Sequence, residues 1–219
     1  MATLPPLVDA YLRRALPEPP PSGAGTLLHQ RGEMRLAPER PWMPFTAEQT
    51  IEASRCGFVW HARFKMAPLV TAVVEDAYED GHGRLDAKIW GLIPVAHGRG
   101  LEVDRGEAQR YLAELAWCPL ALRQNPELTF EALGARTVRV WTHDPDTYVD
   151  LAFDKGGDIV GASTTTRSRG DHVEPWHGRF WDFRDFDGVR APAHGEVSWG
   201  EGADAFCYWR GEVTSLSLR

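Results

Sequence analysis

Residues 58–66 run Phe58-Val59-Trp60-His61-Ala62-Arg63-Phe64-Lys65-Met66, with an apolar side chain at every second position. Because successive side chains of a β-strand point to opposite faces, this alternation predicts a strand with one buried face. Similar patterns lie on both sides of it, at residues 26–36, 69–79 and 84–93. Asp80-Gly-His-Gly83 separates the last two and predicts a tight turn between paired strands.

Residues 42–52 allow two interpretations. Thr46 and Gln49 have the spacing of a helix capping box,. The residues at positions 43, 45, 47, 49 and 51 also alternate with more polar neighbours, which favours a strand. We therefore expect a strand here, next to the one at residues 58–66.

Two segments have the spacing of amphipathic helices. In residues 3–16, Leu7, Tyr11 and Ala15 fall on one stripe, and the prolines of residues 17–21 end the pattern,. In residues 104–116, Tyr111 and Leu115 share a stripe, and Trp117-Cys-Pro119 ends it. Beyond that point only strand patterns are evident, at residues 135–142, 147–154, 158–167, 179–186, 192–200 and 205–217.

These elements predict an α+β fold: one antiparallel, strongly curved half-barrel of about ten strands, with both helices packed on its concave face. We expect residues 1–25 to form an N-terminal helix with a proline-rich linker. Residues 26–219 would then form the half-barrel domain.

Composition narrows the function further. The chain has 24 Lys and Arg against 31 Asp and Glu, so its formal net charge of −7 disfavours a nucleic-acid partner,. Its three cysteines are far apart, which predicts neither a disulfide framework nor a structural zinc site,. No segment has the pattern of a signal peptide or a membrane span, so we expect a cytoplasmic protein.

Metal and cofactor motifs are weak. The nearest approach to a metal-ligand pattern is Asp171-His172-x-Glu174-x-x-His177, in a polar loop where such clusters arise by chance,. The glycine pairs at residues 81–83 and 98–100 match neither a phosphate-binding loop nor a dinucleotide fingerprint. The sequence therefore predicts no metal and no cofactor.

The second helix carries a polar row. Glu107, Arg110 and Glu114 lie three and four positions apart, so they share one face of the helix,. We favour a solvated surface for this row, since the apolar stripe already accounts for the buried side. The alternative is a buried cluster in which Arg110 and Glu114 meet Arg167, Arg184 and Glu196 inside the barrel,.

Aromatic side chains occur on nearly every predicted strand, and nine of them are tryptophans. They either form a closed core or leave a cavity within it that admits an apolar ligand. For the second case we expect the ligand to contact Trp60, Trp90, Tyr111 and Trp117.

Four motifs stand out along the chain: Trp42-x-x-Phe45-x-Ala47-x-Gln49, Gly57-Phe-Val-Trp60-x-Ala62, Asp76-x-Tyr78-x-x-Gly81-x-Gly83 and Arg110-Tyr-Leu-Ala-Glu114-x-x-Trp117-x-Pro119. Together they resemble a family of bacterial proteins of unknown function. Gly188-x-Arg190-x-Pro192, Trp199 and Tyr208 continue the similarity, which covers about residues 26–215. The carboxy-terminal half resembles, more loosely, the LolA and LolB lipoprotein carriers. That resemblance implies an open half-barrel with an apolar cavity for acyl chains.

Two functional hypotheses follow. The first is non-enzymatic binding of an apolar or amphiphilic, lipid-like small molecule in an aromatic-lined cavity. The second is an enzyme of unknown reaction that uses the polar cluster of Arg110, Glu114, Arg167, Arg184 and Glu196. A largely apolar cavity favours the binder, whereas charged groups with perturbed protonation around an open pocket favour the enzyme.

Overall fold

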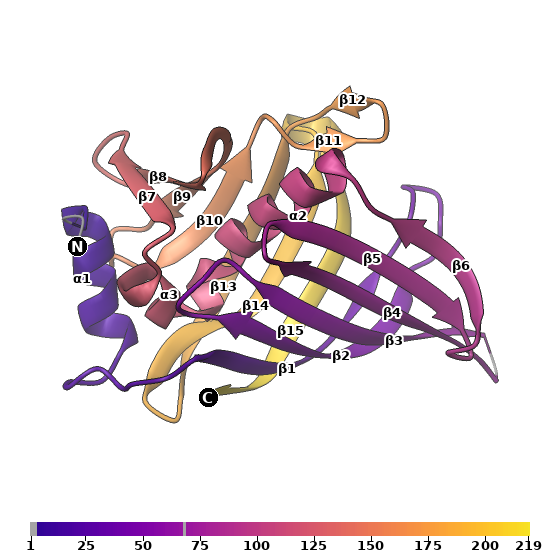
Figure 1. Cartoon of the computed structure of the whole chain (residues 1–219), viewed down its shortest axis with the longest axis horizontal. Coiled ribbons are helices and arrows are strands. Elements are labelled where there is room, and N and C mark those ends of the chain that lie inside the picture. The colour runs from indigo at the N-terminus through magenta and orange to yellow at the C-terminus, as the bar shows by residue number, and fades with distance from the viewer. Residues whose placement is uncertain (1–3, 68) are drawn as a thin grey trace.

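The computed structural model of the chain describes residues 4–67 and 69–219. Its main feature is one sheet of thirteen strands, in the order β6-β5-β4-β3-β2-β1-β15-β14-β13-β10-β9-β8-β7, with every pair of neighbours antiparallel (Figure 1). The first six strands are β1 Gly25–Met34, β2 Met43–Glu52, β3 Phe58–Ala67, β4 Val70–Glu79, β5 His82–Ile89 and β6 Ile93–Gly98. The others are β7 Leu128–Ala132, β8 Thr137–Thr142, β9 Asp144–Phe153, β10 Ile159–Thr164, β13 Trp176–Phe186, β14 Val189–Trp199 and β15 Phe206–Leu218. The short strands β11 Ser168–Arg169 and β12 His172–Val173 pair separately.

The mainly antiparallel architecture is confirmed, but the expected ten-stranded half-barrel is wrong. The sheet has thirteen strands and stays open, with β6 and β7 at its two edges. The predicted strand 84–93 is in fact two strands, because Trp90 and Gly91 adopt positive φ angles of 52° and 70° and reverse the chain. Edge strand β7 lies in residues to which the sequence assigned no element.

Four helical segments occur in the first two-thirds of the chain, one before β1 and three between β6 and β7. They are α1 Pro6–Ala15, α2 Leu101–Ala113, the 3-10 turn η1 Glu114–Trp117 and α3 Pro119–Gln124, and a further short turn, η2, spans Gly202–Asp204. Both predicted helices are present, although residue 3 of the first lies outside the described residues. Helix α3 was not predicted because Pro119 was interpreted as a stop, whereas it occupies the first turn of a new helix, where proline is favoured,.

Helix α2 organises the interior. It contacts β4 and β5 near one edge of the sheet and β8, β9 and β10 near the other, so both ends of the sheet lie against the same helix (Figure 1). Its continuation through η1 and α3 is buried from Leu115 to Leu122, with Leu115 and Leu120 at zero exposure. Helix α1 joins the same core, and the Tyr11 hydroxyl donates a hydrogen bond of 3.1 Å to the Ala116 carbonyl.

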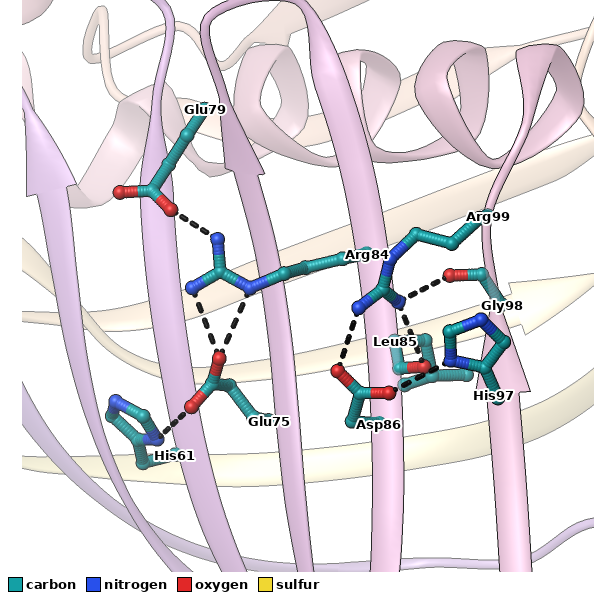
Figure 2. Close-up of polar contacts among 9 residues, drawn as sticks. All are labelled: His61, Glu75, Glu79, Arg84, Leu85, Asp86, His97, Gly98 and Arg99. Carbon is teal, nitrogen blue, oxygen red and sulfur yellow. Dashed lines mark hydrogen bonds and ion pairs between the residues drawn. The ribbon is translucent and has the colours of Figure 1, made fainter.

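The face of β3–β6 that is turned away from α2 is polar and points outward (Figure 2). On it, Arg84 pairs with Glu79 and, at 2.9 Å, with Glu75, whose other oxygen lies 3.3 Å from His61. Farther along, Arg99 and His97 contact Asp86 at 2.8 and 3.0 Å. Because residues in register share a face, this network places the alternate positions of β3 and β4, including Trp60 and Val74, on the inner side,.

Two glycines at the β4–β5 turn are expected to be intolerant of valine for different reasons. Asp80 and Gly81 have φ angles of 51° and 84°, a conformation in which a β-branched side chain is strained, so Gly81→Val should cost about 1–3 kcal/mol,. A Cβ on Gly83 would lie only 2.7 Å from the Val103 carbonyl oxygen of α2, so Gly83→Val should cost more,. Chemical denaturation measures the loss in the free energy of unfolding for each variant. Equal losses for Gly81→Val and Gly83→Val would contradict the close approach of α2 to Gly83.

Candidate functional site

A cavity of about 550 Å³ lies between α2 and the inner face of the sheet. Strands β3, β4 and β5 supply one wall, through inward positions such as Phe64, Ala72 and Ala87. Strands β13, β14 and β15 supply the opposite wall, including Phe180 and Val197. The cavity thus lies where the two halves of the sheet face one another across α2.

The outer part of the cavity is lined by methionine and aliphatic side chains. Met34, Leu36, Met43, Met66 and Val95 lie here, and Leu36, Met66 and Val95 are also exposed to solvent. Methionine adapts to ligands of different shape because its side chain is unbranched and polarisable. None of these residues was among the predicted ligand contacts, although their apolar positions at the ends of the alternating strands were an available indication.

The inner walls are aromatic. Trp117 packs edge-on against Phe180 and Trp209, with centroid separations of 5.2 and 6.3 Å. Its indole nitrogen donates to the Pro192 carbonyl at 2.9 Å, while the Trp60 indole donates to Gln30 Oε1 at 3.0 Å. Because these polar nitrogens are already paired with the protein, the rings offer mainly their carbon surface to the cavity.

A buried ion cluster forms the inner end of the cavity. The Arg110 guanidinium donates through Nε to Glu114 Oε1 at 2.9 Å and through Nη1 to Asp76 Oδ2. All three side chains are at most 17% exposed. The guanidinium also lies over the rings of Phe58 and Trp60, 4.7 and 5.0 Å from their centroids,. Arg110 is therefore held by two carboxylates and two aromatic rings.

Arg167 and Glu107 extend this cluster. Arg167 donates to the Gly106 carbonyl, lies 4.7 Å above the Trp176 ring and is 4.0 Å from Glu107. Burial, reinforced by the nearby negative charge of Asp76, raises the pKa of Glu107 from 4.5 to about 8,. Within the described residues, Asp76 Oδ1 and Glu107 Oε2 are both buried without a hydrogen-bond partner. A proton on Glu107 would leave the five ionisable groups with no net charge.

The structure brings together six of the predicted site residues. Trp60, Trp117, Arg110, Glu114, Arg167 and Glu196 all line the cavity. The solvated surface favoured for Glu107, Arg110 and Glu114 is therefore wrong. The strand carboxylate that meets Arg110 is Asp76, whereas Glu196 pairs with the exposed Arg179 at 3.0 Å. Asp76 was missed because 34 residues separate it from Arg110.

Three predicted site residues lie elsewhere. Trp90 is 55% exposed in the β5–β6 turn, where its indole donates to the Leu69 carbonyl. Tyr111 is fully buried and donates to the Glu52 carbonyl, since it lies on a different side of α2 from Arg110. Arg184 is on the outer face of β13 and pairs with Asp182 at 2.5 Å. Trp90 leaves the predicted strand because the chain reverses there, whereas Tyr111 follows the helical spacing to another side of α2.

Residues 4–67 and 69–219 contain no group of three metal-ligating side chains placed to hold an ion. Over the same residues, no helix is both long and apolar enough to cross a bilayer. The site is thus an apolar cavity that ends in paired charges.

These features define the class of the protein. It is an open antiparallel β-sheet protein with one helix, α2, packed on the sheet and a cavity of about 550 Å³ beside that helix. The chain belongs to a family of unknown function (DUF6920), whose model matches residues 2–217. This confirms the resemblance drawn from its motifs. No curated protein matches the chain.

Two solved structures are similar to it. A DUF1329 family protein from Desulfovibrio piger has a TM-score of 0.52 at 10% identity, covering 97% of this chain and 91% of that one. A LolA superfamily protein from Nitrosomonas europaea has a TM-score of 0.49 at 11% identity, covering 97% of this chain and 92% of the other. At these identities the first similarity concerns the fold alone.

Proposed function

We propose that this protein binds an amphiphilic small molecule in its cavity, without transforming it. The observation that carries the proposal is a cavity of about 550 Å³ whose walls are apolar and whose inner end holds Arg110, Asp76 and Glu114. Ligand pockets are typically of this size and character, with apolar walls and a few convergent polar groups. The apolar part of the ligand would contact the aromatic and methionine side chains, and its polar part would lie toward the ion cluster.

The state of the charges supports binding over catalysis. Arg110 is paired with two carboxylates, and Glu114 also accepts a hydrogen bond from Gln49. Groups that are mutually paired and stacked against rings are poor acids or nucleophiles, because using them would leave a buried partner uncompensated. They are suited to orienting a polar end that adds a hydrogen bond without adding net charge.

Filling the cavity with a larger side chain is expected to weaken binding. Val74 lines the cavity, while its neighbour Val73 points to the outer face of β4, in register with Arg63. Val74→Trp should therefore weaken binding of the neutral probe N-phenyl-1-naphthylamine at least about tenfold, and Val73→Trp should leave it unchanged. Fluorescence titration measures both, and equal affinities for the two variants would refute the assignment. Native mass spectrometry of protein purified from its own cell would identify the ligand.

One observation favours a second candidate, an enzyme. Glu107, with its raised pKa, lies beside the ion cluster, and carboxyl groups with perturbed protonation are common at catalytic sites,. If Glu107 were a general acid, the molecule that co-purifies with the protein would be chemically converted on incubation, and Glu107→Gln would stop the conversion. If the molecule is recovered unchanged from both the wild type and Glu107→Gln, the enzyme hypothesis is wrong and the binding function remains.

A further inference from the structure

The far end of β3–β6 carries an unusual concentration of exposed apolar side chains. It comprises Met66, Leu69, Trp90, Leu92, Ile93 and Val95, here called the apolar tip. Eleven large apolar side chains are exposed in the part of the chain that the structure describes, and these are six of them. Leu69 and Leu92 are the most prominent, at 95% and 81% exposure.

The apolar tip is one surface built from two turns. Trp90 connects them, since its indole donates to the Leu69 carbonyl at 2.9 Å and its backbone amide donates to the Thr71 carbonyl at 2.8 Å. In Figure 1 the start of β4 and the β5–β6 turn lie together at the right-hand end, the far end of the molecule from α1. A contiguous, projecting apolar surface of this kind is uncommon on a monomer and indicates a partner.

Positive charge borders the apolar tip. Arg63 and Lys88 are both in register with Val73 of β4, and Lys65 is in register with Thr71, so all three lie on the outer face next to the turns. All three are exposed, and none forms an ion pair within residues 4–67 and 69–219. The chain has only three lysines and a formal net charge of −7, yet two of those lysines lie at this end. The end is therefore more positive than the protein as a whole.

We propose that the apolar tip docks on an anionic lipid bilayer. Leucine side chains at the ends of two turns can enter the acyl boundary, and a tryptophan that keeps its indole N–H paired suits the interfacial region. The adjacent Arg63, Lys65 and Lys88 would meet the negative surface of the headgroups. A purely apolar partner would not require these charges, and an acidic one would not require the leucines.

Docking in this orientation would bring the cavity mouth to the bilayer. Met66 and Val95 belong both to the apolar tip and to the lining of the cavity. An amphiphile could then pass between the membrane and the cavity with little exposure of its apolar part to water. Membrane docking itself, however, does not depend on what the cavity holds.

Flotation of the purified chain with vesicles tests the proposal. We expect binding to vesicles of phosphatidylcholine and phosphatidylglycerol, and much weaker binding to phosphatidylcholine alone. The double variant Leu69→Asp, Leu92→Asp should reduce binding at least roughly tenfold. Leu133→Asp, Val173→Asp, which changes two exposed apolar residues elsewhere, is the matched control and should bind like the wild type.

The charges are tested separately. Lys65→Gln, Lys88→Gln should weaken binding to the anionic vesicles about 30-fold and leave binding to neutral vesicles unchanged. Vesicles of brominated lipid should quench the tryptophan fluorescence of the wild type more than that of Trp90→Phe. This measurement does not need the double variants, so it tests the proposal even if one of them fails to fold. Equal quenching, or no flotation of the wild type, would overturn the proposal. So would self-association that the aspartate variant abolishes without any vesicle binding. Even if membrane docking were refuted in this way, the proposed binding of N-phenyl-1-naphthylamine in the cavity, measured without vesicles, would still stand or fall on its own result.

Discussion

Replacing Arg110 by alanine is expected to lower the free energy of unfolding by about 3–5 kcal/mol. The substitution leaves Asp76 and Glu114 buried beside one another without their shared cation, each at most 13% exposed. It also removes the guanidinium that lies over the rings of Phe58 and Trp60. Urea denaturation of the wild type and Arg110→Ala measures the loss as a shift of the midpoint.

An exposed pair with the same helical spacing provides the control. Arg13 and Asp9 of α1 also lie four residues apart, but their side chains are 66% and 50% exposed. Arg13→Ala should therefore cost less than about 1 kcal/mol, because water solvates the remaining carboxylate. If Arg110→Ala were as mild as Arg13→Ala, the buried cluster would have no structural role. The triple variant Asp76→Asn, Arg110→Met, Glu114→Gln should recover part of the loss, since it removes all three charges together.

The stability of the protein is expected to fall as pH rises from about 5 to 8, because of Glu107. Burial raises the pKa of Glu107 to about 8 in the folded chain, against 4.5 for an ordinary glutamate. Between these values the folded protein holds a proton that the unfolded chain releases, so folding is progressively disfavoured. The slope is about 1.4 kcal/mol per pH unit, and the contribution is fully present below pH 4.5 and lost above pH 8,.

Glu107→Gln isolates this effect. The variant keeps the shape of a protonated glutamate but cannot ionise, so its stability relative to the wild type should rise across that pH range. Glu102→Gln, an exposed substitution in the first turn of the same helix, accounts for the general effect of losing a carboxylate from α2. Denaturation midpoints at pH 5, 7 and 9 make the comparison. A difference between wild type and Glu107→Gln that does not change with pH would show that Glu107 is ionised throughout.

The sequence predicted local structure well where a single periodicity decided it. The alternation in residues 58–66 corresponds to β3, and the ambiguous segment 42–52 is β2, as alternation favoured over the capping-box spacing. Predictions failed where the chain reverses or restarts within an apolar run. Trp90 and Gly91 divide β5 from β6, and Pro119 begins α3 after the 3-10 turn at Glu114–Trp117.

The candidate site was partly predictable. Helical spacing placed Glu107, Arg110 and Glu114 on one face, and strand alternation placed Trp60 opposite His61. Neither pattern revealed that the polar face of α2 would be buried, since an isolated amphipathic helix favours the opposite orientation. That face is buried because β4 supplies Asp76 and the β10–β11 connection supplies Arg167, which together compensate the charges.

By itself, the sequence determined the mainly antiparallel strands, the two principal helices and the abundance of aromatic side chains in the interior. These depend on patterns within a dozen residues, where geometry requires every second or every third and fourth side chain to share a face. The tertiary structure alone decided the order of thirteen strands, the cavity between their two halves and the burial of the charged row. These depend on contacts between distant segments, such as β4 with α2, which are selected by the free energy of the packed whole and leave no period in the sequence,.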